Sequence, residues 1–216
     1  METEKIKKTT IFATMKDSTV LPVMEEFYSL QGEGFHTGKA AYFLRVGGCD
    51  VGCNFCDVKE SWDKNRHPLV EVNEIVERIV ETKANSVVVT GGEPCLYNLD
   101  YLCKSLKKHR ILLHIETSGS EPLSGIWDWI CFSPKEKTII FPEFYHIANE
   151  LKMIIETKND FAWAEQNASK VNTNCICYLQ PEWSKFDKIT PVIVDYILKN
   201  PKWKISLQSH KYMRIP

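Results

Sequence analysis

The chain has 216 residues, of which 44% are hydrophobic and 25% are charged, and its formal net charge is −1. This composition is ordinary for a soluble globular enzyme and gives no indication of a nucleic-acid or membrane-surface partner. No apolar run reaches the roughly 18–20 residues that a membrane-spanning helix needs, and the N-terminal segment METEKIKKTT has no apolar signal core. We expect a single domain over residues 1–216, of which residues 1–18 are loosely held.

Two predicted strands open the chain. The first covers residues 21–30 and leads into the turn QGEG at residues 31–34. Glycines on both sides of an acid let the backbone approach a ligand closely, although an ordinary hairpin turn has the same pattern. The second strand, residues 40–46, is apolar except for Arg45. Because a buried guanidinium needs an acceptor, we expect Glu33 or a ligand anion to pair with it.

Three cysteines follow the second strand in the stretch CDVGCNFC, and they are Cys49, Cys53 and Cys56. Thiolates this close can bind one soft metal centre, but they leave a four-ligand centre one ligand short. A structural zinc site would need a fourth Cys or His, and the next His is His67, eleven residues further on. The spacing favours an iron–sulfur cluster with an open iron over zinc or a chance grouping.

The remaining cysteines are expected to be small apolar side chains of the core. Eight cysteines without a secretion signal indicate a reducing compartment, so we expect the protein in the cytoplasm. The five outside the stretch are Cys95, Cys103, Cys131, Cys175 and Cys177.

Strands and helices alternate after the cysteines. Helices are predicted over residues 70–83, after the capping residue Asn98, and from Thr190 to Asn200. Strands are predicted at residues 86–90, 111–116, 128–132, 151–155, 175–179 and 203–207. This alternation predicts an α/β fold with a parallel sheet and right-handed crossovers. The length suits a partial TIM-type barrel with outer helices rather than a closed barrel of eight units.

Polar segments stand at the ends of four of these strands, and they read TGGE, ETSG, SPK and LQP. In a partial barrel the C-terminal ends of parallel strands meet at the rim where ligands bind. We therefore expect these segments and the three cysteines to form one site.

The pattern C-x₃-C-x₂-C after one strand, with GGEP after the next, resembles the radical S-adenosylmethionine (SAM) superfamily. The resemblance implies a [4Fe–4S] cluster whose open iron is chelated by the methionyl amine and carboxylate of SAM. One electron from the reduced cluster then gives a 5′-deoxyadenosyl radical. The resemblance also implies that Gly91 and Gly92 let the backbone approach the methionyl ammonium, and that the Glu93 region supplies acceptors for it.

A closer resemblance extends along most of the chain. FYSLQGEGFHTG and AYFLRVGGCDVGCNFCD, with the four polar segments, are similar to the 7-carboxy-7-deazaguanine synthase family. This implies a radical SAM lyase that contracts 6-carboxy-5,6,7,8-tetrahydropterin to 7-carboxy-7-deazaguanine, with loss of ammonia and catalytic use of SAM, in queuosine and deazapurine biosynthesis. It also implies a flavodoxin-like reductant and a homodimer.

The family resemblance implies the residues of the site, with no catalytic group beyond the cluster and the SAM radical. For His210 the sequence favours a surface position over the substrate pocket. Residues implied to bind SAM are Phe55, Gly91, Gly92, Glu93, Ser118, Ser133, Pro134, Lys135, Gln180 and Pro181. Residues implied to bind the pterin are Leu30, Gln31, Gly32, Glu33, Arg45, Thr90, His210 and Pro216, the last reaching back to the substrate.

One position departs from the family. Two places after the third cysteine the family usually has a hydroxyl residue that helps to bind a Mg²⁺ in contact with the substrate. Val58 stands there and offers no oxygen, which is the ligand that Mg²⁺ requires. Asp57 or Ser61, or water and substrate alone, would have to hold the ion.

Two other functions share part of the pattern. A glycine-radical activase has the same cysteine spacing, but it has no need of the QGEG turn, of Arg45 or of a C-terminus in the site. A non-catalytic iron–sulfur or zinc module accounts for the cysteines, but it leaves the polar segments at the strand ends unexplained.

Overall fold

The computed structural model describes residues 18–216, and its strands form one nine-stranded sheet. β1 (Val20–Leu30) lies between β3 (Leu69–Glu71) and β2 (Ala40–Val46) and runs antiparallel to both. From β2 onward every neighbouring pair is parallel. In order, these strands are β4 (Ser86–Gly91), β5 (Leu112–Thr117), β6 (Trp129–Phe132), β7 (Glu150–Ile155), β8 (Ile176–Pro181) and β9 (Trp203–Ile205).

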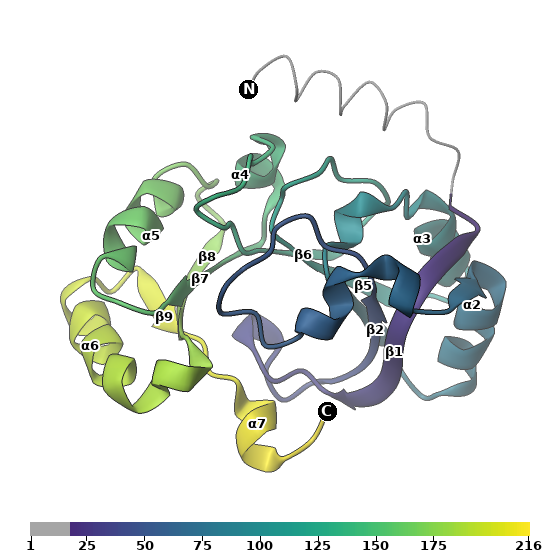
Figure 1. Cartoon of the computed structure of the whole chain (residues 1–216), viewed down its shortest axis with the longest axis horizontal. Coiled ribbons are helices and arrows are strands. Elements are labelled where there is room, and N and C mark those ends of the chain that lie inside the picture. The colour runs from purple at the N-terminus through teal and green to yellow at the C-terminus, as the bar shows by residue number, and fades with distance from the viewer. Residues whose placement is uncertain (1–17) are drawn as a thin grey trace.

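Helices cover the outside of the curved sheet (Figure 1). The two edge strands, β3 and β9, are not paired with each other, so the barrel is partial, as expected. The helices are α2 (Val72–Glu81), α3 (Asp100–Lys107), α4 (Glu143–Ile147), α5 (Asp160–Ala168), α6 (Phe186–Lys199) and α7 (Ser209–Met213). Short 3₁₀ turns are η1 (Gly34–His36), η2 (Lys59–Trp62), η3 (Lys64–Arg66), η4 (Pro94–Leu96) and η5 (Trp183–Lys185).

Alternation along the strands separates an apolar outer face from a polar inner face. On β7, Leu151 and Met153 belong to the large core between the sheet and the helices, whereas Lys152 faces the concave side. A second, small cluster of buried apolar residues lies on the concave side and consists of Ala41, Phe43 and Val88 with Phe27 beside them. The inner face is therefore free to present polar groups to a ligand.

The antiparallel pairing of β1 with β2 corrects the expectation of an all-parallel sheet. Nine residues connect these two strands. A parallel crossover needs a dozen or more residues, so a connection this short allows only the antiparallel arrangement.

Two helix boundaries also differ from the predictions. The helix expected over residues 70–83 begins at Val72, because the two preceding residues pair with β1. The helix expected to open at Thr190 begins at Phe186 and continues through Pro191. Buried isoleucines flank this proline on the helix, and tertiary packing of that face outweighs the local cost of the proline.

Three other expectations concern the remaining cysteines, membrane-spanning helices and the N-terminal segment. Cys175 is half-buried and the other four cysteines outside the CDVGCNFC stretch are buried, and all eight thiols are free. Within residues 18–216 no helix combines the length and the apolar character that crossing a membrane requires. The expectation for residues 1–18 falls, except for Ser18, on residues 1–17, which lie outside the described part of the chain.

Candidate active site

A cavity of about 340 Å³ lies on the concave side of the sheet, at the C-terminal ends of the parallel strands. The strand-end segments TGGE, ETSG, SPK and LQP all contribute residues to its wall, and so does the cysteine stretch. Predicted site residues that line it are Gln31, Glu33, Arg45, Cys49, Cys53, Phe55, Cys56, Val58, Thr90, Gly91, Gly92, Glu93, Ser118, Ser133, Lys135, Gln180, Pro181 and His210. Those that do not line it are Leu30, Gly32, Pro134 and Pro216.

The three cysteines of the CDVGCNFC stretch are half-buried on one side of this cavity. Burial raises the pKa of the Cys49 and Cys53 thiols, and the Nε1 of Trp62 donates a hydrogen bond to the Cys56 sulfur at 3.4 Å. Nowhere in residues 18–216 do three His, Cys, Asp or Glu side chains converge on one point as a single ion requires. In a [4Fe–4S] cubane each thiolate binds a different iron, so this donor set fits such a cluster.

Gly91 and Gly92 allow the end of β4 to lie directly against the cysteine stretch. A Cβ on Gly92 would overlap the carbonyl oxygen of Gly48, and Gly91 has a φ of +136°, which favours glycine. The Gly92 N–H donates to Val46 at 2.9 Å, and the Glu93 N–H donates to Gly48 at 2.8 Å. The glycine pair is therefore required, first of all, by the close contact between the end of β4 and the cysteine stretch.

The Glu93 carboxylate is occupied by donors from the protein itself. It is almost fully buried and accepts hydrogen bonds from the Cys95 N–H at 3.0 Å and the Thr117 hydroxyl at 2.6 Å. The N–H and hydroxyl of Ser118 donate to its other oxygen at 2.8 and 2.5 Å. Glu93 thus joins the GGEP segment to the ETSG segment, and its side chain is a brace for the wall of the cavity.

Lys135 brings a positive charge to the cysteine side of the cavity. Its Nζ donates to the carbonyl oxygen and to the hydroxyl of Ser133, each at 2.7 Å. Burial lowers the pKa of Lys135, while its charge favours the thiolate form of Cys53. A cation held beside the cysteines suits an anionic cluster or a ligand carboxylate.

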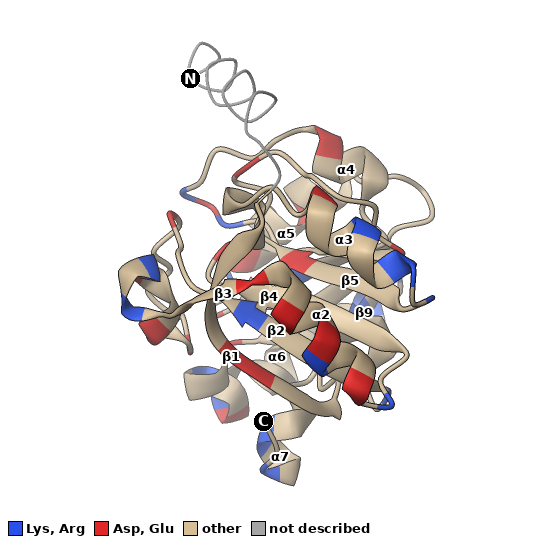
Figure 2. Ribbon diagram, turned by 90° about the vertical axis from the view of Figure 1, so that its right-hand side faces the viewer, with Lys and Arg blue, Asp and Glu red and all other residues tan. Residues whose placement is uncertain are grey.

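Arg45 and Thr90 are register partners on the parallel strands β2 and β4, so both side chains face the cavity. Of the two partners expected for Arg45, Glu33 or a ligand anion, the pairing with Glu33 is wrong, because the Arg45 Nε donates to Glu25 of β1 at 2.6 Å. Glu25 is the register neighbour of Arg45 and therefore lies nearer. β2 has one basic residue and β1 has two adjacent acidic ones, and Figure 2 shows the blue of β2 beside the red of β1. Arg45 stays 18% exposed and lines the cavity.

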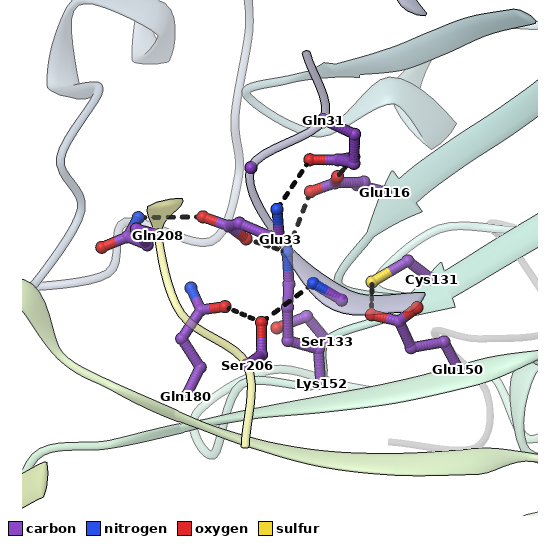
Figure 3. Close-up of polar contacts among 12 residues, drawn as sticks. Gln31, Glu33, Glu116, Cys131, Ser133, Glu150, Lys152, Gln180, Ser206 and Gln208 are labelled. Atoms are coloured by element: carbon purple, nitrogen blue, oxygen red, sulfur yellow. Dashed lines mark hydrogen bonds and ion pairs between the residues drawn. The ribbon is translucent and has the colours of Figure 1, made fainter. Parts of the chain in front are cut away.

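Glu33 is paired with Lys152 of β7 instead, in a polar cluster that Figure 3 displays. Lys152 also donates to Glu116 of β5 at 3.0 Å, and its side chain is only 6% exposed. Gln31 links the Glu116 carboxylate to the backbone of Glu33, since its Nε2 donates to Glu116 at 3.0 Å and its Oε1 accepts the Glu33 N–H at 3.1 Å. Burial raises the pKa of Glu33, but the charge and hydrogen bond of Lys152 together with the hydrogen bond of Gln208 outweigh this and leave the pKa below its usual range.

The segment around α7 closes one side of the site. The Gln208 Nε2 donates to Glu33 at 2.9 Å and to Asp57 at 3.2 Å, and the Lys211 ammonium donates to Asp57 at 2.7 Å. The Ser209 N–H donates to the carbonyl oxygen of Gly32 at 2.9 Å. These contacts hold the C-terminal segment against the QGEG turn and the cysteine stretch together.

His210 lies in the cavity wall rather than on the surface, and burial lowers the pKa of its ring. A Cβ on Gly32 would overlap this ring, which explains the glycine at that position. Pro216 is exposed, and its carbonyl oxygen accepts a hydrogen bond from the Ser29 hydroxyl at 3.2 Å. The C-terminal proline therefore lies against β1, outside the cavity.

A second, smaller cavity of about 10 Å³ lies behind the polar cluster. Glu33, Glu116 and Lys152 line both cavities, and His36 and His114 close the far side with their rings stacked at 4.4 Å. Burial lowers the pKa of both histidines to about 4, so they are neutral near pH 7. The small cavity has room for about one water molecule.

Sequence reasoning missed several residues of the wall, among them the polar residues Lys152, Glu116 and Gln208. Lys152 is the one charged residue of the predicted strand at residues 151–155, and the logic applied to Arg45 would have found it. Glu116 opens the ETSG segment, which was expected at the site as a whole. Gln208 stands in an ordinary polar segment, so no local pattern singles it out.

The comparisons with known proteins agree with this geometry. The model of the radical SAM superfamily matches residues 44–171. The crystal structure of QueE from Escherichia coli superposes with a TM-score of 0.79 at 29% identity, covering 88% of this chain and 95% of that one. This chain belongs to the radical SAM superfamily.

Curated relatives narrow the assignment. The 7-carboxy-7-deazaguanine synthase of Flavobacterium psychrophilum is 55% identical over 197 residues, which cover 91% of this chain and 93% of the relative. The protein of the same name from Synechocystis is 46% identical over 194 residues, covering 90% of this chain and 93% of that relative. The chain belongs to the family of 7-carboxy-7-deazaguanine synthases.

Proposed function

We propose that this protein is a radical SAM lyase that converts 6-carboxy-5,6,7,8-tetrahydropterin to 7-carboxy-7-deazaguanine with loss of ammonia, in queuosine and deazapurine biosynthesis. Family membership supports this reaction. The observation that carries it is the position of Arg45 and Thr90 on the wall of the cavity that the three thiols also line. A cation and a hydroxyl side by side suit a small carboxylated substrate.

Cys49, Cys53 and Cys56 would hold the [4Fe–4S] cluster. When bound, the cluster and SAM supply an electron and a radical strong enough to remove a hydrogen atom from an unactivated carbon. Lys135 would neutralise the methionyl carboxylate from its position beside the thiols. The full set that we propose for SAM is Phe55, Gly91, Gly92, Glu93, Ser118, Ser133, Pro134, Lys135, Gln180 and Pro181, with Glu93 acting through the segments that it braces.

The pterin would lie between the strand ends and the polar cluster. Arg45 binds its carboxylate and Thr90 adds a hydroxyl, while Gln31, Glu33 and His210 face the ring system. Holding the reacting C–H bond in one orientation is what lets a short-lived radical act selectively. Leu30, Gly32 and Pro216 would support this arrangement from outside the cavity, chiefly through the backbone of the QGEG turn and its contact with α7.

Anaerobic turnover tests the proposal directly. Reconstituted protein is incubated with 6-carboxytetrahydropterin, SAM and a strong reductant, and both 7-carboxy-7-deazaguanine and ammonia are measured. We expect product without net consumption of SAM, and no product from Cys53→Ala. A protein that cleaves SAM but leaves the pterin unchanged would refute the substrate and keep the superfamily. Cys175→Ala is the matched control, because Cys175 does not line the cavity.

The residues near Val58 do not fit a Mg²⁺ held by the protein. Val58 lines the cavity without offering an oxygen. Lys211 and Gln208 already bind the Asp57 carboxylate, and the Ser61 hydroxyl donates to the carbonyl oxygen of Val58 at 2.7 Å. Because Mg²⁺ demands several oxygen ligands in near-octahedral geometry, we assign no step of the reaction to it. If an ion takes part in turnover, substrate and water must supply its ligands.

Further proposals concern the working state of the protein. The electron would come from a flavodoxin-like reductant, because reductive cleavage of SAM consumes one. We propose a homodimer on the family resemblance, which light scattering after size exclusion would test. Residues 1–216 would act as one domain in the cytoplasm, where eight unpaired thiols stay reduced.

A further inference from the structure

Lys152 holds a buried charge that the proposed radical step does not use. It lies between two carboxylates, Glu33 and Glu116 (Figure 3). All three side chains line both the main cavity and the small one, and so they separate the two. The Lys152 side chain is 6% exposed, compared with 14% for Glu33 and 22% for Glu116. The group therefore reaches substrate on one side and little more than one water molecule on the other.

This inference rests on the proposed function, because ammonia loss poses a proton problem. The carbon beside the one that carries the leaving nitrogen must lose a proton, and the nitrogen must gain one before it departs. Bulk water cannot serve both ends of this elimination with groups held in fixed positions. A base and an acid within hydrogen-bonding distance of each other can serve both ends.

We propose that Glu116 and Lys152 form a self-resetting proton shuttle for the loss of ammonia. Glu116 takes the proton from the ring carbon, and the electron pair of that C–H bond forms the new C=C bond. The C–N bond breaks with its electron pair on nitrogen, and nitrogen takes a proton from Lys152. The proton on Glu116 then passes to neutral Lys152 along their 3.0 Å hydrogen bond, so both groups regain their starting states.

The electrostatics of the pair favour this order. Burial by itself would lower the pKa of Lys152, but the charges of Glu116 and Glu33 hold it well above its ordinary value. When Glu116 is protonated, one of these two charges disappears and Lys152 becomes a stronger acid. Lys152 thus becomes a stronger acid at the moment when the leaving nitrogen needs a proton, and Lys152 keeps its proton until then.

Glu33 is less suited to act as the base. One of its oxygens accepts from Gln208 at 2.9 Å and the other is held by Lys152, and its pKa lies below the usual range. Glu116 likewise has an amide partner, Gln31, on one oxygen and Lys152 on the other, but its side chain is the more exposed of the two carboxylates. We assign Glu33 to holding the Lys152 ammonium in place.

A substitution that keeps the charge separates proton transfer from electrostatics. Arg in place of Lys152 can retain ion pairs with both carboxylates, but a guanidinium does not release its proton in a protein. The substrate carries deuterium at C6, and the label is followed into the 5′ carbon of SAM while ammonia and deazaguanine are measured. We expect Lys152→Arg to move the label within about threefold of the wild-type rate, and to form product at least about 100-fold more slowly.

Glu116→Gln is the second variant, since it keeps a neighbour for Gln31 and Lys152 and removes the base. It should show the same separation of label transfer from product. Lys202→Arg makes the same change in an ion-paired lysine outside the cavity and serves as the matched control. A Lys152→Arg protein that has lost its cluster is set aside as misfolded, and Glu116→Gln then decides.

The outcomes distinguish a failure of the proton shuttle from a failure of the proposed function. Wild-type turnover with normal product formation in Lys152→Arg would overturn the shuttle, as would parallel loss of label transfer and product in Glu116→Gln. Wild-type protein that forms no deazaguanine would refute the proposed function instead. Label transfer without product in either variant supports the shuttle.

Discussion

Replacing Glu93 by Gln tests whether this side chain braces the cavity wall. The carboxylate accepts from Cys95 and Thr117 on one oxygen and twice from Ser118 on the other. In Gln, an NH₂ group replaces one oxygen and meets a backbone N–H and a hydroxyl. The hydroxyl can rotate to accept, but the N–H stays buried without a partner.

The expected cost follows from this geometry. One buried N–H without an acceptor costs about 1–3 kcal/mol, and loss of charge assistance in the remaining bonds adds about 1–2 kcal/mol. The free energy of unfolding should therefore fall by about 2–5 kcal/mol, a large share of the 5–15 kcal/mol typical of domains. Since the brace joins the GGEP and ETSG segments, cluster content after reconstitution should fall as well.

Chemical denaturation of the cluster-free protein measures the stability change, and iron per chain measures the second effect. Glu143→Gln is the control, because the Glu143 carboxylate is exposed and accepts a bond from the Leu123 N–H. Its effect should stay within about 0.5 kcal/mol. If Glu93→Gln costs less than about 1 kcal/mol while SAM binding is lost, the brace is wrong and Glu93 binds the ligand directly.

Three further outcomes are expected. Arg45→Met should raise KM for the pterin at least about 100-fold, while SAM cleavage without substrate continues, because it removes a charge-assisted contact to the carboxylate; equal loss of both activities would contradict this. Burial lowers the pKa of His36 and His114 from 6.5 to about 4, so the unfolded chain binds more protons in this range and stability falls as the pH drops from about 6.5 to about 4. His114→Gln should flatten that slope in pH-dependent denaturation, whereas His109→Gln, an exposed position, should leave it unchanged. Removing Mg²⁺ with a chelator should change wild-type turnover by less than about twofold, and Val58→Thr should make turnover respond to added Mg²⁺; a strict Mg²⁺ requirement in the wild type would refute the first expectation.

The class of fold could be predicted because local patterns carried it. The run SVVVT at the start of β4 reads as a buried parallel strand, and the polar ends of four strands indicated a shared rim. Errors arose where tertiary packing decided the outcome. Pro191 suggested a helix start, but burial of the flanking isoleucines extends α6 one turn earlier. The β1–β2 pair is antiparallel because its connection is short, which alternation alone does not reveal.

The candidate site divides in the same way. Cys49, Cys53 and Cys56 are close in the chain, and a soft metal centre constrains their spacing, so the amino-acid sequence determines that a cluster can form. The partner of Arg45 and the role of Glu93 depend on which strands are neighbours, and sheet order is a non-local property. Lys152 comes from β7, Glu116 from β5 and Glu33 from the turn after β1, and the nearest two lie 36 residues apart along the chain. Only the curvature of the sheet brings these charges together. The Lys152 ammonium is stable in its buried position because carboxylates from distant parts of the chain surround it.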